Sequence, residues 1–135
     1  MSEEHPALSA AHASWSAVHR KAKQEWLDLM ADEIVIEDPI GVSPLDPIGK
    51  GQCGKEAVSA FWDRNIGPST IEIEAHESFA AGDESAHVMT LTTTLPGGVK
   101  TIVHGIFTYR VNDAGKLTAL RGFWQLDQMK VEQPG

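Results

Sequence analysis

Apolar residues recur at two different periods along this chain, and the change of period separates a helical part from a strand part. In residues 6–21 the apolar positions stand three or four residues apart, which is the spacing of one apolar stripe on a helix. The stripe consists of Leu8, Ala11, Trp15 and Val18. We therefore expect a first helix over this range, with the stripe packed against a core.

Two more helices, a strand and a loop are expected before the middle of the chain. Residues 24–30 and 54–65 carry apolar residues on one side of a helix, and the second of these ends before a Gly-Pro pair. Residues 34–36 are all β-branched and predict a strand that ends at Pro39. Residues 41–53 contain several glycines and prolines without any period and predict a loop near the end of that strand.

The remainder of the chain alternates between apolar and polar residues, as strands do. Four strands are expected, joined by short turns rich in glycine, asparagine and aspartate. They cover residues 70–80, 86–95, 100–111 and 117–131. Helices first and antiparallel strands last predict an α+β fold, with a curved sheet over helices, in a single domain spanning residues 1–135.

The third of these strands is apolar on both faces. Ile102 and Ile106 fall on one face, and Val103 and Phe107 fall on the other. Because one face of an antiparallel sheet is usually solvated, an apolar outer face suggests that something covers it. A homodimer packed through the outer sheet face is the simplest cover, with an additional helix or the C-terminal tail as the alternative.

Composition narrows the possible partners. Eleven Lys and Arg against 19 Asp and Glu give a net charge of −8, which argues against nucleic acid or an anionic membrane as a partner. Cys53 is the only cysteine, so an intramolecular disulfide is impossible. The polar, acidic N-terminus does not resemble a signal peptide, and no apolar run approaches bilayer length. We expect a cytoplasmic location.

No metal or cofactor is expected from the motifs. None of the six histidines forms a ligand pair with useful spacing, and there is neither a phosphate-binding glycine loop nor a Gly-x-Ser-x-Gly elbow. His76, His87 and His104 each fall in a different expected strand. Histidines that are hydrogen-bonded within a sheet are commoner than histidine ligands that meet across it.

Two adjacent carboxylates end the first expected strand. Successive strand side chains point to opposite faces, so Glu37 and Asp38 must diverge. A carboxylate held at the inner end of a strand among apolar residues is a candidate general base. The alternative is that Asp38 merely begins the turn before Pro39, and the local residues alone favour this alternative.

Large apolar side chains from the third helix and the sheet can wall a pocket beside Asp38. These are Phe61, Trp62, Met89, Phe107, Phe123 and Trp124. Each one alone is best explained as core, but a set of this kind between helices and a concave sheet is typical of a site for a small apolar ligand. A buried aspartate is costly in such surroundings, and its retention there favours a functional role.

Several segments resemble the ketosteroid isomerases, and especially their actinobacterial steroid-isomerase-like branch. That family belongs to the broad class of cone-shaped α+β proteins that includes the SnoaL-like cyclases and nuclear transport factor 2. The segments are residues 29–32, 36–41, 54–58, 61–62, 109–112, 114–116 and 121–124. The Glu-Asp-Pro-hydrophobic-Gly motif in residues 37–41 is the most specific of them.

The resemblance covers about residues 8–130 and implies a cofactor-independent isomerase of a Δ5-3-ketosteroid or a similar apolar polycyclic ketone. By resemblance, Asp38 is the base that removes a proton from the carbon between carbonyl and alkene and returns it two carbons away. Trp124 matches an aromatic wall position near the base. Trp62 stands where the family has a tyrosine that supports the oxyanion hole.

The chain departs from the family at both oxyanion donors. Ser14 stands at the position of the oxyanion tyrosine, and Phe107 at that of the second carboxylic acid. Loss of one such donor typically costs about a hundred- to a thousandfold in rate. Substitute donors are Ser14 through a water, the indole N–H of Trp15 or Trp62, or Tyr109.

Two functions follow from these residues. The first is an isomerase with Asp38 as general base and a substrate site formed by Ser14, Trp62, Met89, Phe107 and Trp124. The second, suggested by Ser14 and Phe107, is a non-catalytic protein that binds steroids or other apolar small molecules in a pocket with a degenerate oxyanion hole.

Overall fold

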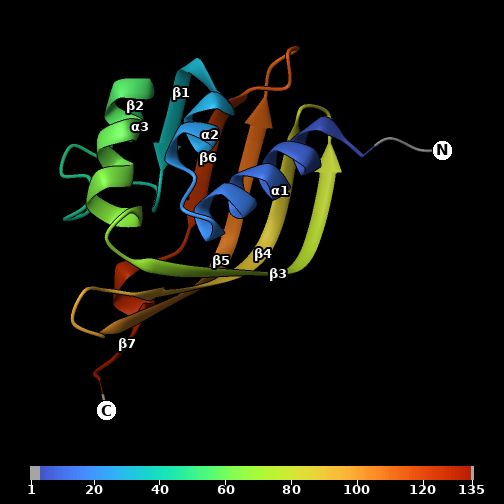
Figure 1. Ribbon diagram of the computed structural model, residues 1–135. Helices are drawn as coiled ribbons and strands as arrows, with labels where there is room; N and C mark the ends of the chain where they lie inside the picture. The colour runs from blue at the N-terminus through green and yellow to red at the C-terminus, as the bar shows by residue number, and fades with distance from the viewer. Residues whose placement is uncertain (1–3, 135) are drawn as a thin grey trace.

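A curved sheet organises the molecule, and the helices cover its concave face (Figure 1). The computed structural model describes residues 4–134. Its helices are α1 (Pro6–His19), α2 (Lys23–Asp28), α3 (Lys55–Phe61), a π-helix at Trp62–Ile66 and a 3-10 helix at Leu126–Gln128. Its strands are β1 (Met30–Glu37), β2 (Gln52–Cys53), β3 (Thr70–Ala81), β4 (Glu84–Thr94), β5 (Lys100–Val111), β6 (Leu117–Phe123) and β7 (Lys130–Glu132).

The strand order is β2-β1-β6-β5-β4-β3, with β7 paired to β5. Neighbours are antiparallel except for β1 and β6, which run parallel. A bulge between Ala75 and Glu77 interrupts the β3–β4 register, and bulges bend the strand that carries them. The α+β fold with a curved sheet and early helices is confirmed.

The C-terminal part differs from the single strand that was expected over residues 117–131. β6 ends at Phe123, and the chain returns to the sheet as β7, which pairs with the start of β5. The Phe123 carbonyl crosses so close to Gly105 that a Cβ there would lie 2.5 Å from its oxygen. The chain therefore leaves the sheet at Trp124, and an alternating sequence alone cannot show such a crossing.

Helix α1 packs across β3, β4 and β5 through small side chains. The centre of its buried face is formed by Ala7, Ala10, Ala11, Ser14, Ala17 and Val18. This face is rotated from the expected stripe, since Leu8 and Trp15 are only partly buried. Small residues let the helix lie close to the sheet, and they bring Ser14 to the centre of the contact.

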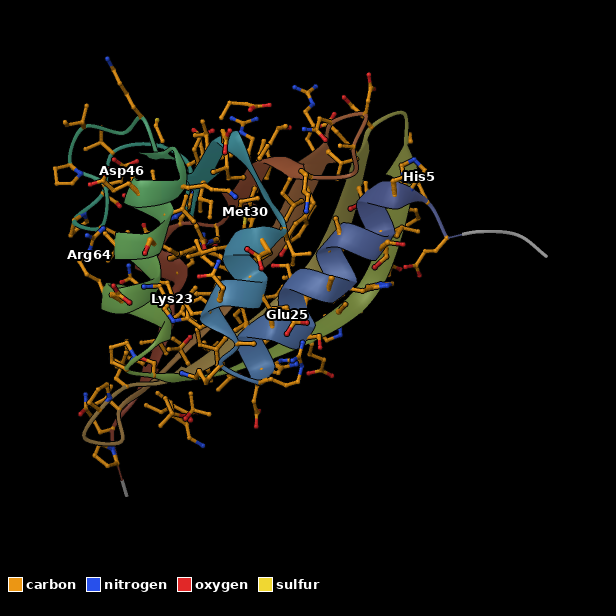
Figure 2. The ribbon with its side chains drawn as sticks, turned by 45° about the horizontal axis from the view of Figure 1, so that its top comes forward. His5, Lys23, Glu25, Met30, Asp46 and Arg64 are labelled. Atoms are coloured by element: carbon orange, nitrogen blue, oxygen red, sulfur yellow. The ribbon has the colours of Figure 1, made fainter. Side chains whose placement is uncertain are left out.

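Lysines fix the helices to one another. Lys21 Nζ donates to the carbonyls of Ile66 and Gly67 at 2.6 and 3.2 Å and so caps the end of the π-helix. Figure 2 shows Lys23 on α2 directed towards α3, and its Nζ lies 2.9 Å from Asp63. None of the described helices combines the length and hydropathy needed to cross a membrane.

Candidate active site

The two carboxylates at the end of β1 diverge, as expected from the pleat. Glu37 lies 3.0 Å from Arg121 Nε on the outer face of the sheet. Asp38 faces the concave side and is joined to Pro39 by a cis peptide bond. Ile40, which follows Pro39, donates its N–H to the Gly122 carbonyl at 3.0 Å, so β6 fixes the chain directly after Asp38 and Pro39.

The Asp38 carboxylate is held by an indole. Trp124 Nε1 donates to Asp38 Oδ1 at 2.6 Å. A Cβ on Gly122 would lie 2.7 Å from that same oxygen and 3.0 Å from Trp124 Nε1. Glycine at this position therefore leaves the space in which the carboxylate and the indole meet.

Burial raises the pKa of Asp38, and the hydrogen bond from Trp124 partly opposes that rise. Protein surrounds Asp38 on all sides, and the surface that it still exposes faces the cavity. A carboxylate whose pKa is raised is a stronger base than one in water. It also carries the only formal charge among the described residues that line the cavity.

The cavity lies between the helices and the concave sheet and has a volume of about 340 Å³. That is at the lower end of the range for small-molecule sites, roughly 300–1,000 Å³. Its lining is predominantly apolar, with side chains from α1, α2, α3, the π-helix and five strands. An apolar body with few polar atoms is the ligand that such a lining favours.

The strand register orders the lining residues from the closed end to the mouth. Tyr109 pairs with Leu120 at the closed end, and Phe107 pairs with Gly122 beside Asp38, two residues nearer the mouth. Thr93 pairs with Thr101 still further along the same strands. Asp38 therefore lies nearer to the closed end of the cavity than to its mouth.

The mouth is formed by a loop and by the chain between β6 and β7. Leu45 lines it and is 44% exposed, and Leu126 and Met129 line it from the other segment. The carboxylate of Asp46 accepts backbone N–H groups of Gly49 and Gly51 at 3.1 and 2.7 Å. Figure 2 labels Asp46 in this loop beside α3, where it holds the turn.

Two buried hydroxyls stand at the closed end, and each accepts a hydrogen bond from a tryptophan. Trp15 Nε1 donates to the Tyr109 hydroxyl at 2.8 Å, and Trp26 Nε1 donates to Ser14 Oγ at 3.1 Å. Ser14 and Tyr109 are 2% and 3% exposed, and both line the cavity. These pairings were not foreseen, because the partners are far apart in the sequence and share no motif.

The phenol of Tyr109 stays protonated. Burial is the main cause that raises its pKa. The hydrogen bond from Trp15 lowers the pKa by a smaller amount, and the nearby charge of Asp38 raises it by an amount smaller still. Tyr109 therefore presents an O–H group, rather than a charge, to the closed end of the cavity.

His87 supports this end from behind. Ser85 Oγ donates to the Ala7 carbonyl at 3.0 Å, so it accepts from His87 Nε2–H at 2.7 Å. His87 Nδ1 then accepts from the Ser78 hydroxyl at 2.7 Å. Burial lowers the pKa of His87 to about 4, and the nearby His12 lowers it by a smaller amount. The neutral ring meets the Trp15 ring edge-on, with the two ring centroids 4.8 Å apart.

Four of the five expected substrate-site residues line the cavity together with Asp38: Ser14, Met89, Phe107 and Trp124. Trp62 does not line it. Its ring packs on Trp26 at 5.1 Å, one layer behind the wall, because the π-helix that begins at Trp62 turns Asn65 and Ile66 towards the cavity instead. Phe123, also expected in the wall, is 48% exposed on the outer face.

Among residues 4–134, no group of three or more His, Cys, Asp or Glu side chains is arranged to hold a metal ion. Around its closed end, the site offers the Asp38 carboxylate, the buried hydroxyls of Ser14 and Tyr109 and a largely apolar wall.

The chain is similar to a well-defined set of known proteins. The family model described as SnoaL-like domain matches residues 11–120. A Delta 5-3-ketosteroid isomerase from Mycobacterium sp. is 43% identical, over 96% of this chain and 100% of that chain, with a TM-score of 0.93.

Two further structures are similar over nearly the same length. RV0760c from Mycobacterium tuberculosis, in complex with estradiol-17beta-hemisuccinate, is 46% identical over 94% of this chain and 99% of that chain, with a TM-score of 0.91. A computationally designed 17-OHP binder is 43% identical over 96% and 100%, with a TM-score of 0.92. The resemblance to the ketosteroid isomerases and their superfamily is confirmed.

Proposed function

The chain belongs to the SnoaL-like domain family, and from that premise we propose that it is a cofactor-independent isomerase that moves a double bond in a Δ5-3-ketosteroid or a related apolar polycyclic ketone. The observation that carries the proposal is Asp38, a single carboxylate fixed by Trp124 in an apolar cavity. The similarity to a ketosteroid isomerase supports the substrate class.

In the proposed reaction Asp38 takes the proton from the carbon between the carbonyl and the alkene. The electrons of that C–H bond form a dienolate, and the neutral carboxyl then returns the proton to the far end of the former alkene. Trp124 occupies Oδ1, so Oδ2 is free to face the substrate. Because the pKa of Asp38 is raised, it lies closer to the pKa of the weakly acidic C–H group, and proton transfer from that carbon is less unfavourable.

A second function is favoured by a specific contact. Phe107 lies against Gly122 beside the carboxylate, where the family resemblance implies a carboxylic acid. Similar chains hold steroids, as the RV0760c complex and the designed 17-OHP binder illustrate. The alternative function is therefore a steroid-binding protein without catalysis.

The test is a spectrophotometric assay of Δ5-3-ketosteroid conversion to the conjugated Δ4 isomer. Asp38→Asn is expected to lower kcat by about 10²–10⁴-fold, the usual contribution of a general base. Glu37→Gln is the matched control, because it neutralises the adjacent carboxylate on the other face. If the wild-type protein binds the steroid saturably but does not convert it, the isomerase proposal is wrong and the steroid-binding function is supported.

We also propose a homodimer through the outer face of the sheet. Ile106 and Phe123 are cross-strand neighbours there, and they are 45% and 48% exposed. Exposed apolar pairs at the centre of a sheet face are better buried against a second copy than left in water.

A further inference from the structure

We propose that the hydroxyls of Tyr109 and Ser14, each fixed by a tryptophan N–H, form the oxyanion site at the closed end of the cavity. This inference rests on the proposed function, since it names the groups that stabilise the dienolate. In the proposed reaction Asp38 must return its proton to carbon, so the oxygen needs a donor of its own. Phe107, beside Asp38, has no donor.

The Tyr109 hydroxyl has a free proton in the right place. A phenol has one O–H and two lone pairs, and Trp15 Nε1 occupies a lone pair at 2.8 Å. The hydroxyl makes no other hydrogen bond to the described residues, and it lines the cavity. A hydroxyl that accepts a hydrogen bond becomes a better donor, so Trp15 both orients Tyr109 and strengthens it.

Ser14 repeats the arrangement from the helical side. Its Oγ accepts from Trp26 Nε1 at 3.1 Å, which leaves its O–H to donate. Trp26 is held in turn by Trp62, whose ring lies 5.1 Å away. The supporting role that the resemblance implies for Trp62 is therefore indirect, since Trp62 acts on the site through Trp26 and Ser14.

The spacing between these donors and the base suits a ketone. Tyr109 lies two residues deeper along β5 than Phe107, whose partner Gly122 touches Asp38. Two residues of strand span about 7 Å. In the ketone, the carbonyl oxygen and the carbon that loses its proton are two bonds apart. A hydrogen bond from Tyr109 to the oxygen and a proton transfer from the carbon to Asp38 make up the rest of the distance.

The arrangement also predicts how a ligand enters. The oxygen-bearing ring goes in first, towards the hydroxyls, and the apolar remainder extends past Trp124 and Met89 to the mouth. Preorganised, water-excluded donors of this kind are the usual source of oxyanion stabilisation.

The test uses binding, so it does not depend on turnover. The probes are 2-naphthol and 2-methylnaphthalene, which have the same shape and differ in one hydroxyl. Binding is measured by fluorescence titration in the Asp38→Asn background, whose neutral amide resembles the protonated base. Tyr109→Phe is expected to reduce the preference for 2-naphthol about tenfold, the value of one hydrogen bond, and Ser14→Ala to reduce it by less.

Thr93→Val is the matched control, because it removes a hydroxyl at the mouth and should leave the preference unchanged. Thermal melts identify any variant that fails to fold, and Trp15→Phe then gives an independent test, since it removes the N–H that orients Tyr109. An unchanged preference in folded Tyr109→Phe and Ser14→Ala overturns the inference.

Turnover separates the inference from the proposed function. In the isomerase assay, Tyr109→Phe is expected to lower kcat about 10²–10³-fold with little change in KM. If wild type is active and Asp38-dependent but Tyr109→Phe retains full kcat, the oxyanion assignment fails and the isomerase stands. If no variant turns over but the naphthol preference depends on Tyr109, the hydroxyl site stands and the isomerase fails.

Discussion

Neighbouring residues of the same kind have opposite surroundings on the concave and outer faces of the sheet. Asp38 lies against an indole in an apolar cavity, and its pKa is raised. Glu37, one residue earlier, pairs with Arg121 on the open face. The pleat of the strand directs one carboxylate inward and the other outward. Because helices cover the concave face, the inward carboxylate is buried in apolar surroundings.

The histidines repeat the contrast. His87 faces inward, where two serines satisfy both ring nitrogens and burial lowers its pKa to about 4. His76 and His104 are exposed on the outer face and share the hydroxyl of Thr90 at 2.8 and 2.9 Å. On the concave face burial shifts the pKa values of Asp38 and His87, whereas the histidines of the outer face stay exposed.

The largest disruption of the contrast is expected from Gly122→Ala. Its Cβ would lie 2.7 Å from Asp38 Oδ1 and 2.9 Å from the Phe107 ring, so the Asp38 carboxylate must move. Misplacement by about 1 Å costs around a hundredfold in rate, and kcat in the isomerase assay should fall by about that factor. Gly67→Ala is the control, since its Cβ meets Trp62 only at 3.4 Å. Equal activity of both variants would contradict the placement of Asp38.

The next effect is on folding. His87→Ala leaves the Ser78 and Ser85 hydroxyls without their partner and opens a void, so the free energy of unfolding should fall by about 2 kcal/mol or more. His104→Ala on the outer face should change it by no more than about 0.5 kcal/mol. Urea unfolding compares the two, and similar losses would show that the faces do not differ as described.

A smaller effect distinguishes function from stability at Asp38. Burial raises the pKa of Asp38 above its ordinary value of 3.8. The stability that the protonated side chain contributes to the fold is therefore fully present below pH 3.8, and it is lost as the pH rises through the raised pKa. Asp38→Asn should therefore melt a few degrees above wild type at pH 7, and the difference should vanish near pH 3.5. A variant that melts below wild type at pH 7 would contradict this sign. Glu37→Gln should show no such gain.

The smallest effect on the fold itself is expected from Ile106→Lys. A lysine at this exposed position should leave the stability of the monomer within about 0.5 kcal/mol of wild type, but it should dissociate the proposed dimer. Light scattering at matched concentrations measures the mass of each. A monomeric wild type would instead leave the outer face without a partner.

Local patterns were enough to predict the main helices and strands and the divergence of Glu37 and Asp38, but they did not assign Asp38 to the inner face. Period and pleat are properties of neighbouring residues, so the sequence displays them directly. The Trp15–Tyr109 pair spans 94 positions and depends on how α1 crosses β5, which no local pattern records. The same holds for the break at Trp124, which Gly105 on another strand makes possible.

Trp62 shows a different limit. The resemblance placed it in the oxyanion support, but its ring packs on Trp26 behind the cavity wall. The π-helix that starts at Trp62 changes the angular position of the side chains that follow it, and Asn65 and Ile66 line the cavity. Apolar content alone does not distinguish an α-helix from a π-helix.

The chain between β6 and β7 borders the cavity mouth with Leu126 and Met129, and the three residues of β7 that follow pair with Lys100–Ile102 at the start of β5. A ligand that enters the cavity therefore passes residues from a different part of the chain than those that surround Asp38. The rates of entry and exit and the affinity inside the cavity thus depend on separate residues. A substitution at the mouth can change how fast a ligand is exchanged and leave the groups around Asp38 untouched.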